Sequence, residues 1–367
     1  MGIRQHSRND KIKTRPWQCL LKAASQRLPP GRGTLHAHRN RMQLNLESQS
    51  VIAISGRFHR PATNPEKTSV FEKIEFPSEG ALLCGRFYRH ACRGAPALVM
   101  AHGTSATITM VVDQYAAAFH RAGFNVLLYD HLGFGASGGE PRQQINPWVQ
   151  ARGYRDAVNY LREFRHIERV VLWGDSYSAM QVLVVGALID SIAALVAQIP
   201  ATGIELPPLQ PSDDLVEQMR EVFAHGDIAG GPEHTMGPMP VVSPDQSGMP
   251  SLLKPIQAYR WFVEHGGRFG TRWENRATRV IPPTPVPFNA HLTAPYLRAP
   301  TLMLVGRDDE MVHCNRSVQQ RIFEKIAARK KLYEIDGGHF GLLWHPSSLF
   351  DESVECQVEF LRDALEL

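Results

Sequence analysis

The stretch RVVLWGDSYSAMQVLVVGA, residues 169–187, is the part of the chain around which the rest is organised. It begins with the short apolar run Val170 to Trp173, which has the character of a buried strand. The pentapeptide Gly174 to Ser178 follows, and an apolar segment with helical spacing comes directly after it. This order predicts a strand, a tight turn and a helix. Because such a turn projects the hydroxyl of Ser176 out of the sheet, above the positive end of the helix, we interpret Ser176 as a nucleophile.

The Gly-x-Ser spelling occurs twice more, so the spelling by itself is weak evidence. Gly103 to Ser105 is one instance, and Gly135 to Ser137 even completes Gly-x-Ser-x-Gly through Gly139. Ser137, however, lies in a glycine-rich loop with no strand immediately before it. Ser176 has both flanks that the nucleophile turn requires, so we interpret Ser137 as a turn residue.

The bulk properties fit a globular α/β protein. The 367 residues suffice for one large domain with an insertion or for two modest domains, and the apolar content of 43% is ordinary. The formal charge of +4 is too small to indicate a nucleic-acid partner, and the positive excess lies at the N-terminal end. No apolar run reaches the roughly 18 residues that a membrane span needs, so we expect no transmembrane segment.

Residues 1–66 form a basic segment with little sustained periodicity. Within residues 1–46, ten Lys or Arg residues stand against the single acid Asp10. We expect most of this extension to be poorly ordered. Two alternatives stay open: Met42 is the true start, or the segment is an Arg-rich, acid-poor transit peptide.

The five cysteines are scattered and show no metal-ligand spacing. Their odd number does not suggest a disulfide framework, so we expect a reducing, cytoplasmic location. We expect neither a metal nor a cofactor to take part in the chemistry.

Strands and helices alternate through the rest of the chain, beginning with an antiparallel hairpin around the turn Pro77 to Gly80. The expected parallel strands are 97–101, 124–129, 170–173, 192–199, 301–305 and 331–335, and the expected helices outside the opening stretch are 112–122, 147–164, 315–328 and 350–365. This alternation predicts an α/β fold whose mostly parallel sheet is covered by helices on both faces.

A long segment, residues 203–295, interrupts the alternation; we call it the insertion. It is dense in Pro, Gly and Met, shows helical pieces near 213–225 and 252–264, and has no sheet character. We expect it to form a cap over the active site, between core parts at 67–202 and 296–367. Four aromatic residues give it apolar material to pack, which argues against a disordered insertion: Tyr259, Trp261, Phe262 and Trp273.

An acid and a base follow the nucleophile in the order that this kind of turn predicts. A serine hydroxyl is a poor nucleophile at neutral pH, so a base must take its proton and a third group must orient the base. One predicted strand runs into Gly306-Arg307-Asp308-Asp309 and the last one into Gly337-Gly338-His339. Sites in open α/β sheets lie beyond the carboxyl ends of the strands, so we expect Ser176, the acid and His339 to converge.

Asp309 is preferred to Asp308 as the acid because it lies three residues after the glycine. The other aspartate would be a turn or capping group. His339 is preferred to His345 because it closely follows a strand and two glycines that let the chain turn sharply. His345, which precedes a proline, is interpreted as a surface or supporting residue.

Two backbone N–H groups are expected to stabilise the oxyanion that forms during acyl transfer. The N–H of Tyr177, directly after the nucleophile, is one donor by the geometry of the turn. The second is expected from the turn that starts at His102-Gly103, most simply the N–H of Thr104.

From about Val70 to the C-terminus, these motifs together make the chain resemble the α/β-hydrolase superfamily. His102-Gly103 matches the oxyanion turn of that superfamily, and residues 130–137 match the loop after the next strand. Two positions depart from the pattern. Ser178 stands where glycine is usual, and His131 stands where arginine is commoner.

Three segments are similar in particular to the dienelactone-hydrolase and Xaa-Pro-peptidase-like branch: residues 130–161, 273–275 and 304–312. A serine at the nucleophile turn argues against the dehalogenases and epoxide hydrolases of the superfamily, which use aspartate there. The resemblance implies acyl transfer through an acyl-serine, and the methionines and aromatics of the insertion favour a moderately apolar small-molecule acyl substrate.

We therefore expect hydrolysis of a carboxylic ester, lactone or thioester. A peptidase or amidase and an acyltransferase would use the same residues, so they remain alternatives. A binding protein that has kept the fold without catalysis is the alternative from a different class, and the presence of all three triad residues argues against it.

Overall fold

The computed structural model describes residues 70–367, so the predictions for residues 1–66 concern a segment outside the described part of the chain. An eight-stranded sheet lies at its centre, and every strand pair from β4 onward in the spatial order is parallel, whereas the first two pairs are antiparallel. In spatial order the strands are β1 (Glu72–Ser78), β2 (Ala81–Tyr88), β4 (Asn125–Tyr129), β3 (Ala97–Ala101), β6 (Val170–Asp175), β7 (Ile192–Gln198), β10 (Thr301–Gly306) and β11 (Lys330–Ile335).

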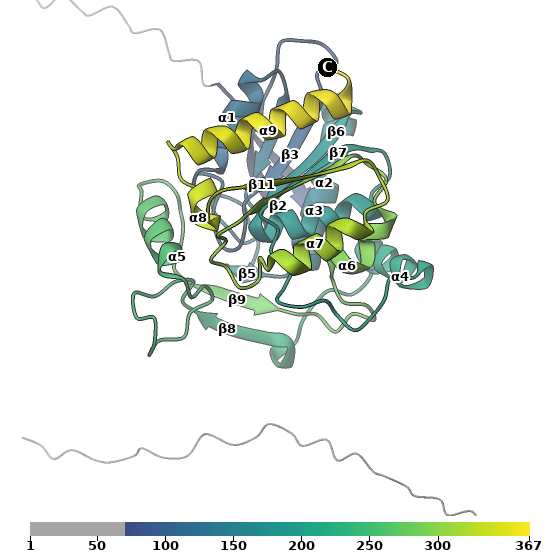
Figure 1. Cartoon of the computed structure of the whole chain (residues 1–367). Helices are drawn as coiled ribbons and strands as arrows, with labels where there is room; N and C mark the ends of the chain where they lie inside the picture. The colour runs from purple at the N-terminus through teal and green to yellow at the C-terminus, as the bar shows by residue number, and fades with distance from the viewer. Residues whose placement is uncertain (1–69) are drawn as a thin grey trace, which may run out of the picture. The chain divides into compact units, whose positions relative to one another are not determined.

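Helices cover both faces of this sheet (Figure 1). The apolar sides of α1 and α9 belong to one buried cluster, and those of α2, α3 and α7 belong to the other. These helices are α1 (Val112–Arg121), α2 (Pro147–Arg165), α3 (Ser176–Leu188), α7 (Arg316–Lys325) and α9 (Ser348–Leu365). The predicted α/β fold, a mostly parallel sheet with helices on both faces, is confirmed.

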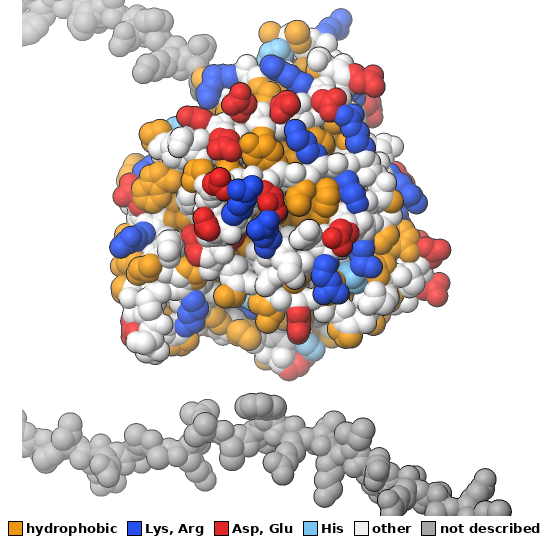
Figure 2. Space-filling view, in the orientation of Figure 1, with side chains coloured by type: hydrophobic (Ala, Val, Ile, Leu, Met, Phe, Trp, Pro, Cys, Tyr) orange, Lys and Arg blue, Asp and Glu red, His pale blue; other side chains and the backbone are white. Residues whose placement is uncertain are grey.

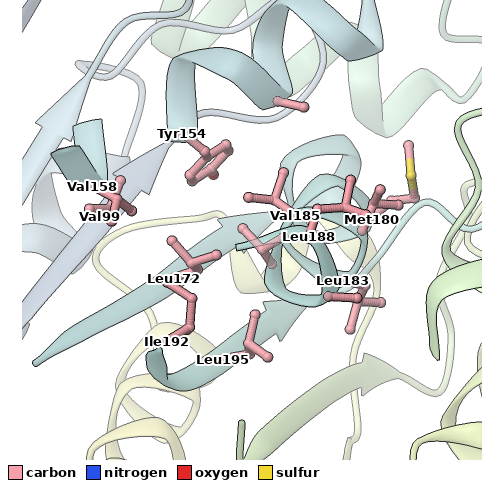
Figure 3. Packing of buried hydrophobic residues seen from close by; sticks show 14 of the residues in the cluster. Val99, Tyr154, Val158, Leu172, Met180, Leu183, Val185, Leu188, Ile192 and Leu195 are labelled. Carbon is pink, nitrogen blue, oxygen red and sulfur yellow. The ribbon is translucent and has the colours of Figure 1, made fainter. Parts of the chain in front are cut away.

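Successive residues of the central strands alternate between the two clusters, as the two-residue period of a strand requires. Val99 and Leu172 pack with α2 and α3, whereas Met100 and Trp173 pack on the opposite face. Figure 3 shows the first cluster, where Leu172 and Leu195 lie against the apolar side chains of α3. Every residue of α3 from Ser178 to Leu188 is buried, which is why this helix is apolar all round.

The insertion contains both helices and strands, so the expectation that it has no sheet character is wrong. Its strands β8 (Thr235–Met239) and β9 (Ala277–Val280) form a second, three-stranded sheet with β5 (Gln144–Ile145), which belongs to the core part before α2. These strands are short, and β8 contains Gly237 and Pro238, so they lack the apolar alternation that marks a strand in sequence.

The remaining helical elements lie mainly in or next to the insertion and are α4 (Asp213–Ala224), η1 (Pro232–His234), α5 (Ile256–Trp261), η2 (Phe262–Gly266), α6 (Ala290–Thr293), η3 (Ala294–Tyr296) and α8 (His339–Leu342). Two of them correspond to the expected helical pieces. The second piece starts later than expected, because Pro255 occupies the N-cap position of α5. Part of the insertion packs on the core, since Arg152 of α2 donates hydrogen bonds to the carbonyl groups of Val222 and Phe223 in α4.

The surface carries both signs of charge. Figure 2 shows Lys and Arg side chains interspersed with Asp and Glu on the face that carries α7, β11 and α9. Ion pairs there include Lys331–Glu359 at 3.5 Å. Within residues 70–367, the helices are all too short or too polar to cross a membrane.

Candidate active site

Ser176 lies at the junction of β6 and α3 with a backbone φ of 54°, in the left-handed region that non-glycine residues rarely adopt. The close approach of strand and helix explains the glycine two residues earlier. A Cβ on Gly174 would stand 2.4 Å from the backbone carbonyl of Ser178, so a larger residue would push the helix away. The sequence pattern at 174–178 therefore forms the sharp strand-to-helix turn that was predicted.

Asp309 and His339 lie in the loops that follow β10 and β11, and they contact each other directly. His339 Nδ1 is 3.0 Å from Asp309 Oδ2, and the two side chains are only 3% and 4% exposed. The other carboxylate oxygen of Asp309 accepts a hydrogen bond from the backbone N–H of Met311 at 2.9 Å. Asp308 is exposed, so the geometry pairs His339 with Asp309, as the spacing to the glycine indicated.

The pKa of His339 lies well above its usual value of 6.5. Burial lowers it, but Cys314 and the carboxylate of Asp309, which both lie against the ring, raise it by more. The pKa of the Cys314 thiol is itself raised by burial, so this group is neutral near pH 7 and the aspartate carries the stabilising charge.

Two side chains contact His339 in the structure but were not predicted from the sequence to belong to the site. Glu310 accepts hydrogen bonds from the backbone N–H groups of His339 at 2.7 Å and Phe340 at 3.3 Å, and so holds the start of α8. The signal that could have revealed Glu310 is its place directly after Asp309, at the strand end that was expected to meet His339. An acid that reaches a helix N-terminus commonly accepts hydrogen bonds from the free N–H groups there. Cys314 Sγ lies 3.5 Å from His339 Nδ1, and nothing in the spacing of the cysteines indicates this contact.

Among residues 70–367, one group of side chains could hold a metal ion: Asp309, Cys314 and His339, whose ligand atoms lie within 4.8 Å of one another. A soft divalent ion fits such a donor set. The same His339 nitrogen already interacts with Asp309, so metal binding there would displace the contact that orients the imidazole.

The predicted turn at His102-Gly103 lies against the nucleophile. A Cβ on Gly103 would stand 3.0 Å from Ser176 Cβ and 2.9 Å from a carboxylate oxygen of Asp175, which explains why a glycine is needed. Thr104, Ser176 and Tyr177 line the same cavity, so both predicted N–H donors come from residues beside the serine.

Hydrogen bonds to two carbonyl groups hold the orientation of this turn. His102 Nδ1 lies 2.9 Å from the Gly103 carbonyl, and the Ser178 hydroxyl donates to the His102 carbonyl. A trans peptide directs its N–H opposite to its C=O, so the N–H groups of Gly103 and Thr104 point the other way. The carbonyl contacts thus determine where the N–H of Thr104 is aimed.

The two departures from the family pattern contact each other. His131 Nε2 is 3.1 Å from Ser178 Oγ, and the backbone N–H of His131 donates to His102 Nε2 at 3.2 Å. Because the Ser178 proton goes to the His102 carbonyl, His131 must donate from Nε2. Burial lowers the pKa of both rings, to about 4 for His102, so both are neutral.

Asp175 is a buried acid directly before the nucleophile. Burial raises its pKa to about 7, while the charge of His339 and nearby backbone groups act in the opposite direction. Its Oδ1 atom has no hydrogen-bond partner among the described residues, and the residue lines the cavity. This role of position 175 could not be predicted from the sequence, because the residue between Gly174 and Ser176 carries no fixed chemistry in the turn motif.

A cavity of about 480 Å³ opens in front of Ser176, a size typical of small-molecule sites. The core contributes Ser176, His339 and their neighbours. The insertion contributes a mostly apolar wall that includes Leu252, Trp261 and Phe262. Residues of the insertion and Ser176 therefore line the same cavity, and the role of the insertion as a cap stays a prediction.

Ser137 and His345, which were not predicted to be catalytic, lie outside the cavity wall. Ser137 is buried in its loop, where its hydroxyl donates to the carbonyl of Asp130 at 2.6 Å and accepts from the N–H of Cys84 at 2.8 Å. The ring of His345 packs on Phe350 at 4.5 Å between centroids. Neither Ser137 nor His345 lines the cavity.

The chain is similar to known proteins in sequence and in structure. A family model described as the alpha/beta hydrolase family matches residues 98–352, more than half of the chain. The chain is 29% identical over 327 residues to a thiohydrolase from Aspergillus aculeatus, covering 82% of this chain and 95% of the relative. It is 25% identical over 303 residues to an acyltransferase from Aspergillus calidoustus, covering 79% and 94%.

A crystal structure of an α/β hydrolase from Penicillium sp. sh18 is similar in fold. The TM-score is 0.60 at 24% sequence identity, and the match covers 81% of this chain and 99% of the other. At this identity the likeness concerns the fold alone.

The contact between His131 and Ser178 gives a stability prediction. Replacing Ser178 with Ala leaves the His131 Nε2–H and the His102 carbonyl buried without their partner, which should lower the free energy of unfolding by about 1–3 kcal/mol. Urea unfolding of the two proteins measures the difference. Ser348→Ala, at an exposed position in the first turn of α9, is the control and should change it by less than about 0.5 kcal/mol. Equal effects of the two substitutions would contradict the assigned network.

Proposed function

The chain belongs to the α/β hydrolase family, and from this premise we propose that it is a serine hydrolase that cleaves carboxylic esters or thioesters through an acyl-serine intermediate. The observation that carries the proposal is the convergence of Ser176 with the buried Asp309–His339 pair at one cavity. Hydrolases that use this constellation share the same division of roles.

In the proposed acylation step, Ser176 Oγ attacks the substrate carbonyl carbon while His339 Nε2 takes the hydroxyl proton. Asp309 holds the ring through Nδ1 and stabilises the imidazolium. The N–H groups of Thr104 and Tyr177 donate to the oxyanion. Collapse of the tetrahedral intermediate then breaks the bond to the leaving alkoxide or thiolate, which takes the proton from His339.

In the second step an acceptor attacks the acyl-serine while His339 takes its proton. Collapse of the second tetrahedral intermediate breaks the bond to Ser176 Oγ, which takes the proton back from His339. Water as acceptor gives hydrolysis, and an alcohol, thiol or amine gives acyl transfer. The thiohydrolase among the relatives favours thioester cleavage, and the acyltransferase favours an acceptor other than water as the second candidate. Product analysis with water and a competing alcohol present separates the two.

The residues that line the cavity favour a moderately apolar acyl group as the bound part of the substrate. Trp148 and Phe288 lie edge to face with their ring centroids 4.9 Å apart, and both line the cavity. Met180 of α3 adds a flexible apolar side chain that adapts to irregular shapes. We propose that the insertion forms a cap whose apolar wall selects the acyl chain.

Labelling with a fluorophosphonate probe tests the nucleophile. The purified protein should react with the probe and turn over p-nitrophenyl esters or acyl thioesters, and Ser176→Ala should abolish labelling and lower kcat by roughly 10⁴-fold or more. Labelling that survives in Ser176→Ala would show that the nucleophile is another residue.

Single asparagine substitutions test the acid. Asp309→Asn should lower kcat by roughly 10⁴-fold, because the amide favours the wrong tautomer of His339. Asp308→Asn, one residue away and exposed, is the matched control and should stay close to the wild-type rate. Equal losses in the two variants would exclude Asp309 as the orienting acid.

The raised pKa of His339 predicts the acid limb of the pH profile. Only the neutral imidazole accepts the serine proton, so kcat/KM should fall as the pH decreases through the pKa of His339, with a midpoint above the ordinary value of 6.5. Asp309→Asn removes the stabilising charge and should move the midpoint downward. A wild-type midpoint at or below 6.5 would contradict the assignment.

A further inference from the structure

Apart from histidines, two charged side chains line the cavity in the described part of the chain. Asp175 lies beside the nucleophile, and Arg279 comes from the insertion. The rest of the wall is mostly apolar, with a few neutral polar groups such as Thr284 and Asn289. A single arginine in such a wall is a specific chemical feature of the site.

The backbone of Arg279 is held in a sheet, whereas its side chain has no bonding partner among residues 70–367. It lies in β9, where it is paired with Ile145 of β5 on one side and Met236 of β8 on the other, and it is half-buried. Among residues 70–367 its guanidinium makes no hydrogen bond, ion pair or ring contact with any partner. Arg276, three residues earlier, is bound instead to Glu274 at 2.9 Å.

The charge of Arg279 acts on groups next to the nucleophile. Burial raises the pKa of Tyr177 to about 12, and Arg279 opposes that rise. The pKa of His313 is lowered by burial and further by Arg279. Both residues line the cavity, and Tyr177 directly follows Ser176 in the chain, so the cation and the nucleophile act on one ligand space.

A guanidinium offers five donors in a planar fork that matches a carboxylate or a phosphate. Partial burial of an unpaired guanidinium costs free energy. A ligand that supplies an anion offsets this cost by pairing with the guanidinium. Asp175, the one acid in the cavity wall within residues 70–367, does not fill this role, because the groups that act on its carboxylate besides burial are His339 and backbone groups.

We propose that Arg279 binds a carboxylate or phosphate of the substrate, so that the enzyme prefers acyl esters or thioesters with a negative charge away from the scissile carbonyl. This inference rests on the proposed function and adds the substrate class to it. The anion belongs either to the far end of the acyl chain or to the leaving group.

Two matched substrate pairs distinguish the two sources. The first is a p-nitrophenyl ester of a linear dicarboxylic acid with its far carboxylate free, against the same ester with that carboxylate methylated. The second is an acyl thioester of 4′-phosphopantetheine against the same thioester of pantetheine. Wild-type kcat/KM should be roughly 10- to 100-fold higher for the anionic member of one pair, as expected for hydrogen bonds to a charged group.

The variant Arg279→Gln should lose this preference through a higher KM for the anionic substrate, so that the ratio of kcat/KM between the charged and the uncharged member of the pair falls toward one. Arg276→Gln, on the same segment but outside the cavity wall, is the matched control and should keep the preference. No preference in either pair, or a preference that persists in Arg279→Gln, would overturn the inference. Ser176-dependent turnover of the neutral esters would leave the proposed function standing in that case.

A binding measurement makes the test independent of turnover. In the Ser176→Ala protein, calorimetry should show a medium-chain dicarboxylic monoester, or phosphopantetheine, binding at least about 10-fold more tightly than its uncharged counterpart. The difference should vanish when Arg279→Gln is added. Equal affinity for the charged and uncharged ligands of both pairs would refute the role of Arg279.

Discussion

The backbone of Ser176 is held in a left-handed conformation, and the rest of the site depends on this constraint. The conformation persists because its surroundings determine it. Gly174 lets α3 approach β6, the α3 helix is buried along its length, and the Ser176 carbonyl accepts a hydrogen bond from Ala201 at 2.9 Å. A strained residue at the junction of two rigid elements keeps its side chain in one place relative to the sheet edge.

Much of this could be predicted from the sequence because the proposed catalytic residues stand just past strand ends. Asp309 and His339 follow strands whose apolar runs are easy to see, and the topology of a parallel sheet brings their ends together. The family and the fold are now shown, whereas the catalytic roles of the residues at 104, 176, 177, 309 and 339 remain proposals that rest on geometry. The apolar run before the turn motif and the helical segment after it, rather than the motif alone, predicted the position of the serine.

Other features could not be predicted, for reasons that differ. The second sheet was missed because β8 and β9 are short and because β8 contains Gly237 and Pro238, which strands usually avoid. The contacts of Cys314 and Asp175 arise from how loops fold, and no local pattern encodes them. Ser178 and His131 were visible as separate departures from a family pattern, 47 positions apart, and only their 3.1 Å contact shows that they form one unit.

The pairing of β5 with β9 ties the wall of the cavity to the core. The N–H of Thr278 donates to the carbonyl of Gln143 at 2.9 Å, just before α2 begins, and α2 in turn binds α4 through Arg152. An insertion attached by a hinge alone could open without disturbing the sheet. Here the insertion is connected by hydrogen bonds to the helix that covers the central strands, so loosening it removes contacts of the core, and the two parts should melt in a single cooperative transition.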